Sequence, residues 1–173
     1  MIRDILSIRG AKVLHQKTGE LLATLNWPIV DPDTGVIEAF WVKSMVEGSK
    51  NAIILTSTIL GFKKNIYITS EKMIMDPSEN VRITDILQEG RRIIEAEVKN
   101  ESSKKYGKAY NFSFSTDTFV MRQLFVQRSV LGMFQFGHRI FPYERILRVL
   151  PHLILVEDDS TEKEASPAPA EPA

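Results

Sequence analysis

An internal repeat constrains the fold of this chain more than any other feature, because similar segments recur 80 to 88 residues apart within 173 residues. Three pairs of segments correspond: Asp4–Leu14 with Asp85–Ile94, Phe40–Val42 with Leu124–Val126, and Ile66–Ile68 with Ile154–Val156. Solenoid repeats have a period of roughly 20 to 50 residues, so this period is too long for a solenoid. The repeat therefore predicts a domain that occurs twice.

The first copy contains a clear hairpin signal at Ile29–Val42. Two runs of β-branched and aromatic residues flank the turn Asp31–Gly35, in which proline presets φ and glycine supports a positive φ. Strict alternation along the second run places Ile37, Ala39 and Trp41 on one face, and Val36, Glu38, Phe40 and Val42 on the other. Apolar groups on both faces favour a small closed sheet over a half-solvated one.

Short apolar segments separated by turn residues predict five strands in each copy. In the first copy they are 12–15, 21–30, 36–43, 52–56 and 65–69, with a helical turn at 57–61. In the second copy they are 92–99, 108–114, 119–127, 136–141 and 152–157, with a helical turn at 142–146. The predicted fold class is mainly β: two small β-barrels in tandem, each with a short helical turn.

A polar, turn-rich segment at Ser70–Val81 separates the copies, which places the predicted domains at 1–80 and 81–158. Residues 159–173 contain acidic groups, proline and alanine but no large apolar residue. Such a segment has nothing to bury, so we predict a disordered acidic Pro/Ala tail.

Composition excludes several classes of protein. The chain has no cysteine, which excludes disulfides, thiolate catalysis and cysteine-ligated metals. No apolar run is long enough to span a membrane, and the first residues do not resemble a signal peptide, so we expect a cytoplasmic protein. Charge is uneven, with a net charge of +5 over residues 82–156 and −5 over residues 157–173.

No residue pattern typical of catalysis, of a cofactor or of a metal site occurs. No G-x-S-x-G motif or glycine-rich phosphate loop is present, so we expect a protein that is not an enzyme. His15, His138 and His152 lie far apart in the sequence, without the close spacing of a ligand pair. Asp31 and Asp33 are typical of turn chemistry, and the ligand pattern of a calcium loop is missing.

Two segments of the second copy indicate binding surfaces. The run Val130–Gly137 is apolar and glycine-containing, and its candidate partner-binding residues are Leu131, Met133, Phe134 and Phe136. The alternative interpretation is a core strand with a bulge at Gly132, and a third hypothesis is peripheral contact with a membrane surface. Basic residues near aromatic ones form a candidate RNA-contacting set: Lys104, Lys105, Lys108, Arg122, Arg128, Arg139, Arg145 and Arg148.

The order of these elements resembles the PRC-barrel family. The resemblance rests on Thr18–Leu21, on the Asp31–Gly35 turn before an apolar strand, and on the ending Ile66–Ile68. The second copy departs from it, because its turn Ser115–Thr118 lacks proline and glycine. This β-barrel module also occurs in the H subunit of photosynthetic reaction centres and in the ribosome maturation factor RimM.

The resemblance implies a docking module and offers no catalytic residue to transfer. Our leading hypothesis is a non-enzymatic scaffold or adaptor that binds another macromolecule through its barrel surfaces. The alternative is an RNA-binding or ribosome-associated maturation factor that uses the basic second copy.

Overall fold

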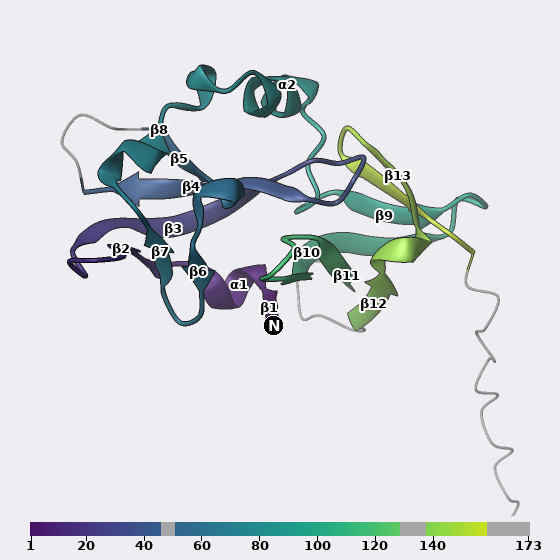
Figure 1. Cartoon of the computed structure of the whole chain (residues 1–173). Coiled ribbons are helices and arrows are strands. Elements are labelled where there is room, and N and C mark those ends of the chain that lie inside the picture. Colours follow the sequence, from purple (N-terminus) through teal and green to yellow (C-terminus); the bar gives the residue numbers. More distant parts are fainter. Residues whose placement is uncertain (46–50, 129–137, 159–173) are drawn as a thin grey trace, which may run out of the picture.

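The computed structural model describes residues 1–45, 51–128 and 138–158. The protein is mainly β, and its strands form two sheets that lie side by side (Figure 1). The predictions for Leu131, Met133, Phe134 and Phe136 and for the tail 159–173 fall outside the described residues.

The first sheet has the strand order β6-β7-β2-β3-β4-β5-β8. Its strands are β2 (Lys12–His15), β3 (Leu21–Val30), β4 (Ile37–Ser44), β5 (Ala52–Leu55), β6 (Gly61–Phe62), β7 (Ile66–Ile68) and β8 (Ile74–Met75). All neighbours are antiparallel except β2 and β7, which run parallel. The predicted hairpin is confirmed as β3 and β4.

The second sheet has the order β12-β11-β10-β9-β14-β13, with β1 paired to β10. Its strands are β1 (Ile2–Asp4), β9 (Glu97–Asn100), β10 (Lys105–Ser115), β11 (Met121–Gln127), β12 (His138–Pro142), β13 (Ile146–Leu150) and β14 (Leu153–Val156). The parallel pair β9 and β14 corresponds to β2 and β7 of the first sheet. One topology therefore occurs twice, which accounts for the repeat in the sequence.

Short helices connect the strands. They are α1 (Ile5–Ile8), α2 (Val81–Glu89), and the 3₁₀ turns η1 (Thr56–Thr58), η2 (Glu71–Met73), η3 (Pro77–Glu79) and η4 (Tyr143–Arg145). The two predicted helical turns correspond to η1 and η4. The helix α2 lies over the first sheet (Figure 1), whereas β1 and α1 contact the second sheet through β10.

The two hairpin turns pair with each other where the sheets meet. Val36 and Val120 form an antiparallel bridge. The Ile37 N–H donates to the carbonyl of Phe119 at 2.8 Å, and the Met121 N–H donates to the carbonyl of Gly35 at 2.9 Å. Val120 occupies in the second turn the position of Val36 in the first, so the contact is reciprocal, as across a two-fold axis.

One apolar core extends through both sheets. Phe40 and Phe62 from the first sheet approach Phe114 from the second, with ring centroids 6.0 to 6.3 Å apart. All three side chains are buried, and they belong to one hydrophobic cluster. Since neither half covers this cluster alone, the halves stabilise each other by burying it.

The predicted face of Ile37 is wrong, because β4 contains a β-bulge. Ile29 pairs with Ala39 and Val30 pairs with Ile37, so Glu38 is an extra residue in β4. The extra residue shifts the alternation by one position. Ile37 therefore belongs to the shared core, whereas Ala39 belongs to a second cluster on the opposite face.

Two further expectations differ from the structure. The segment 92–96 is not part of β9, because Glu95 has a φ of 70°, which interrupts an extended strand. The hydrogen-bonded ladders of the described residues form open sheets, so two closed barrels stay a prediction.

Candidate functional site

Helix α2 forms a second apolar cluster with the outer face of the first sheet, which is the face opposite the shared core. Asn80 caps the helix by accepting the Ile83 N–H at 3.1 Å, and Gly90 ends it in the left-handed conformation. Ile83 is buried in one cluster with Ile29, Ala39 and Ile53, and Ile86 and Trp41 both pack against this cluster. The helix is thus fixed on the sheet by a small apolar face.

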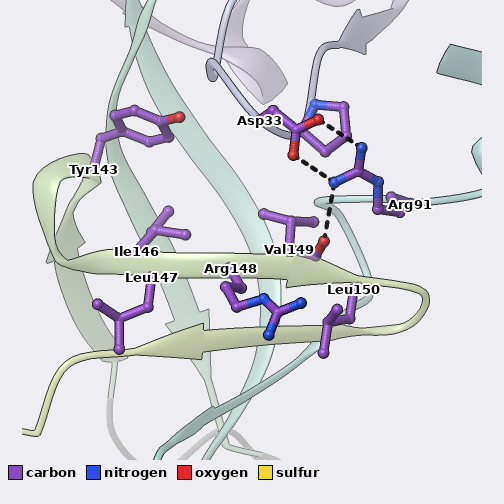
Figure 2. A pocket seen from close by; sticks show the side chains of 9 residues that line it. Asp33, Arg91, Tyr143, Ile146, Leu147, Arg148, Val149 and Leu150 are labelled. Carbon is purple, nitrogen blue, oxygen red and sulfur yellow. Dashed lines mark hydrogen bonds and ion pairs between the residues drawn. The ribbon is translucent and has the colours of Figure 1, made fainter.

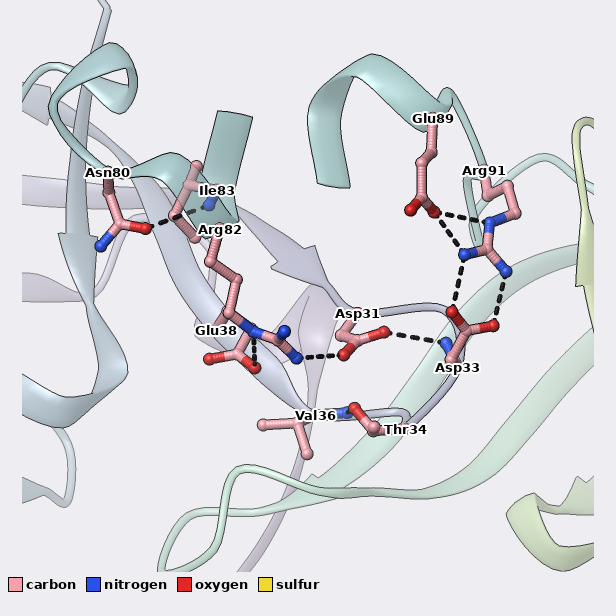
Figure 3. A network of polar contacts seen from close by, with 10 residues as sticks. All are labelled: Asp31, Asp33, Thr34, Val36, Glu38, Asn80, Arg82, Ile83, Glu89 and Arg91. Atoms are coloured by element: carbon pink, nitrogen blue, oxygen red, sulfur yellow. Dashed lines mark hydrogen bonds and ion pairs between the residues drawn. The ribbon is translucent and has the colours of Figure 1, made fainter. Parts of the chain in front are cut away.

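Charged contacts hold α2 in register with the hairpin turn (Figure 3). Arg82 donates to Glu38 at 2.9 Å and to Asp31 at 2.5 Å, and the Asp31 side chain is only 9% exposed. The other oxygen of Asp31 accepts the N–H of Asp33 at 2.9 Å, which confirms its predicted turn chemistry. A buried carboxylate needs such partners to offset its lost hydration.

Arg91 connects the two halves. Its guanidinium donates to both oxygens of Asp33, at 2.6 and 2.8 Å, and to the Val149 carbonyl at 3.4 Å (Figure 2). It also donates to Glu89 (Figure 3). The hydrogen bonds from Arg91 lower the pKa of Asp33, and the carboxylates of Asp33 and Glu89 raise the pKa of Arg91. The turn, the segment after α2 and β13 are therefore tied together by one side chain.

A groove of about 460 Å³ opens between α2, the first sheet and the start of the second half. We call it the tryptophan groove, because both tryptophans of the chain, Trp27 and Trp41, line it. Its remaining wall consists of Pro28, Ile29, Val30, Ile86, Leu87, residues 90–95 and Phe112. The guanidinium of Arg9 lies 4.4 Å above the Trp27 ring, a cation–π contact.

The lining of the tryptophan groove is mainly aromatic and aliphatic. Its ionisable lining residues are Arg91, Arg92 and Glu95, and Arg91 is engaged by Asp33 and Glu89. The lining residues include no serine, threonine, cysteine, histidine or lysine in the described part of the chain. Aromatic and aliphatic walls with a few charged groups are typical of a site that receives apolar groups of a ligand.

A second, smaller pocket of about 200 Å³ lies between the Asp31–Gly35 turn and β13 (Figure 2). Tyr143 lines it, and its ring packs against Gly35 so closely that a Cβ there would lie 2.4 Å from the tyrosine Cζ. Burial and the charges of Asp31 and Asp33 raise the pKa of Tyr143. This pocket is therefore part of the contact between the halves.

Comparison with known proteins leaves the family open. Neither the protein-family models nor the curated proteins contain a match to this chain. The resemblance to the PRC-barrel family thus stays a prediction from the sequence.

The three histidines lie on separate elements. His15 Nδ1 accepts the N–H of Lys17 at 3.3 Å and of Thr18 at 3.2 Å, so it stabilises a turn. His138 lies beside Tyr110, with ring centroids 5.7 Å apart, and His152 has a φ of 62° in the β13–β14 hairpin. Within residues 1–45, 51–128 and 138–158, no three His, Cys, Asp or Glu side chains gather as a metal site would require.

The candidate RNA-contacting residues do not form one patch. Lys105 and Lys108 lie with Arg148 on the outer face of the second sheet, which is the face opposite the shared core. Lys105 pairs with Lys99, Lys99 with Leu155, and Leu155 with Arg148, and paired residues point to the same face. Arg139 lies on the other side, over the Tyr106 ring. The remaining four are distributed over a loop, a bulge, a strand end and η4: Lys104, Arg122, Arg128 and Arg145.

Sequence reasoning missed the tryptophan groove because it missed α2. The signals were present: Asn80 and Gly90 are typical end residues, and Ile83 and Ile86 lie on one helical face between them. Among the described residues, no helix has the length and apolar character that would let it cross a membrane.

Proposed function

We propose that this protein is a non-enzymatic scaffold or adaptor that binds another macromolecule, and that the tryptophan groove receives apolar side chains of that partner. The observation that supports the proposal most is that both tryptophans, half-buried, line one apolar groove. Tryptophan and arginine are enriched among the residues that dominate the affinity of protein interfaces. Leu87, which is 40% exposed, adds aliphatic surface at the same groove.

Membership of the PRC-barrel family is part of the same proposal. Its support is the residues of the first hairpin together with one strand order that occurs in both sheets. A family of docking modules fits a chain whose candidate site is a groove with a mainly apolar lining.

Site-directed crosslinking tests the proposal. A photoreactive residue at Leu87 should capture a specific partner in native cells, and the purified partner should then shift the tryptophan emission. Because both tryptophans line the groove, the whole emission reports on it.

Matched variants on α2 make the experiment decisive. Leu87→Arg should abolish binding of the captured partner, whereas Val81→Arg should retain it, because Val81 is 76% exposed and lies outside the groove. Equal binding by both variants, or turnover of a small substrate that one point mutation abolishes, would contradict the proposal.

A second candidate function, binding to structured RNA, is favoured by a basic row on the outer face of the second sheet. Lys105 pairs with Lys99, and Lys99 connects through Leu155 to Arg148. Lys108 shares this face opposite Glu97, whose carboxylate forms an ion pair with Lys105 at 2.9 Å. Cations spaced along a sheet suit a phosphate backbone.

RNA binding would weaken linearly in log salt and strengthen on deletion of residues 157–173. The double variant Lys105→Glu/Lys108→Glu should abolish it, and Lys63→Glu/Lys64→Glu, at exposed residues of the first half, should not. Absence of binding at low salt excludes this candidate.

A further inference from the structure

The outer faces of the two sheets correspond residue by residue. At the centre of the first face, Trp41 of β4 pairs with Ile53 of β5. At the centre of the second, Phe125 of β11 pairs with Ile140 of β12. Both centres therefore present one aromatic and one isoleucine side chain side by side.

The two faces differ in what covers them. Ile53 is completely buried beneath α2, together with Ile83 of that helix. Ile140 is 54% exposed. Phe125 is half-buried, and its ring lies beside that of Tyr110, with centroids 6.4 Å apart. Among the described residues, the second face thus exposes apolar surface whose counterpart is covered by a helix.

The charges around the two faces differ. On the first face, Arg82 of α2 pairs with Asp31 and Glu38. Ser115 holds the position of Asp31, because each carbonyl accepts the N–H four residues later in the equivalent turn. Arg122 holds the position of Glu38, because each is the extra residue of the equivalent bulge. The first face thus offers two carboxylates to Arg82, whereas the equivalent positions of the second face hold a neutral serine and a guanidinium.

We infer that the outer face of the second sheet binds an acidic amphipathic helix of a partner protein, in the way that the first face holds α2. The helix has a carboxylate in place of Arg82, followed one and four positions later by aliphatic residues in place of Ile83 and Ile86. The tail 159–173 is acidic but has no large apolar residue, so it does not supply this pair. The inference rests on the proposed function only in taking a protein as the ligand, since it uses a different site.

Two synthetic peptides of the α2 sequence, residues 80–90, are the probes. One keeps Arg82 and the other has Arg82→Glu, and both are stapled between positions 81 and 85, whose residues are exposed in α2. The staple is needed because a peptide this short is not helical by itself. Binding of the dye-labelled peptides to the full chain is measured by fluorescence anisotropy.

The Arg82→Glu peptide should bind about three- to tenfold more tightly than the Arg82 peptide, because it replaces a repulsion from Arg122 with an attraction. On the Arg122→Glu chain the order should reverse. Ile140→Glu should weaken binding of the preferred peptide by about tenfold or more, since it places a charge in the apolar centre. Leu60→Glu, at a leucine of similar exposure in the first half, should leave binding unchanged.

An unchanged order on the Arg122→Glu chain would overturn the inference. So would binding that is insensitive to Ile140→Glu and alters the tryptophan emission, because the peptide would then have displaced α2 from the first sheet. If neither peptide binds, and both Arg122→Glu and Ile140→Glu abolish RNA binding, the face is a nucleic-acid surface and the inference is wrong. The Leu87→Arg chain should bind the peptide normally, which separates this result from the test of the tryptophan groove.

Discussion

Gly35 and Phe119 occupy the same position in the two equivalent hairpin turns, and both have a left-handed φ, of 67° and 57°. Each N–H donates to the carbonyl four residues earlier, that of Asp31 or Ser115. The turn thus keeps its conformation where the second half has a phenylalanine. The Phe119 ring stacks on Phe62 and on Phe114, which offsets the unfavourable backbone.

Gly35→Ala should destabilise the protein by about 3 kcal/mol or more, measured by urea denaturation. The substitution combines a left-handed alanine with a clash against the Tyr143 ring. Gly19→Ala is the control, because Gly19 has a similar φ of 71° and a Cβ added there would meet nothing within 4 Å. It should cost only about 1 kcal/mol. Equal losses would show that the tyrosine moves away freely.

Ile83→Ala should lower the free energy of unfolding by about 2 to 4 kcal/mol, since this side chain is 1% exposed between α2 and the first sheet. Val81→Ala, on the same helix at 76% exposure, should change it by less than about 0.5 kcal/mol. Urea denaturation monitored by tryptophan emission measures both. Similar values for the two variants would mean that α2 is not packed on the sheet.

Stability should fall as the pH drops below 3.8, the ordinary pKa of an aspartate. The pKa of Asp33 is lower in the folded protein, because Arg91 donates hydrogen bonds to the carboxylate. The folded state therefore binds the proton less readily than the unfolded state, and the stabilisation present above 3.8 is lost as the pH falls through the folded value. Asp33→Asn should give a shallower fall in melting temperature between about pH 6 and about pH 2. An unchanged slope would assign the acid sensitivity to other carboxylates, such as Asp76 and Glu97, whose pKa values are also lowered.

Ile5→Ala should destabilise the protein by about 2 to 4 kcal/mol, because the side chain is fully buried in the shared core. Leu6→Ala, at 45% exposure on the same turn of helix, is the control and should have little effect. Hydrogen exchange should show the loss of protection in β10, which pairs with β1. Loss of protection confined to the first sheet would contradict this assignment.

Local sequence predicted much of the fold because most strands lie between turn residues. The Asp31–Gly35 turn fixed the β3–β4 hairpin, and the repeat anticipated one topology in both sheets. The bulge at Glu38 was missed, since a bulge is favoured by the twist of two paired strands and has no strong local signal. Strict alternation therefore placed Ile37 on the wrong face.

The candidate site was harder to predict, because it depends on contacts between distant segments. Trp27 and Trp41 lie on neighbouring strands, but they line a groove only because α2 returns over the first sheet. Arg82 and Asp31 are 51 residues apart, and nothing near either residue specifies the other. The partner-binding residues predicted at 131–136 lie outside the described residues, so that prediction stays untested.

The pairing of β1 with β10 has a consequence for synthesis. Ile2 lies opposite Ser115, so β1 leaves the ribosome more than a hundred residues before the strand with which it pairs. The nascent first half therefore holds an unpaired strand and an uncovered Ile5 until β10 has been made. A gene cut near codon 80 would separate β1 from its partner strand, so we expect neither fragment to accumulate in soluble form alone, whereas co-expression restores both.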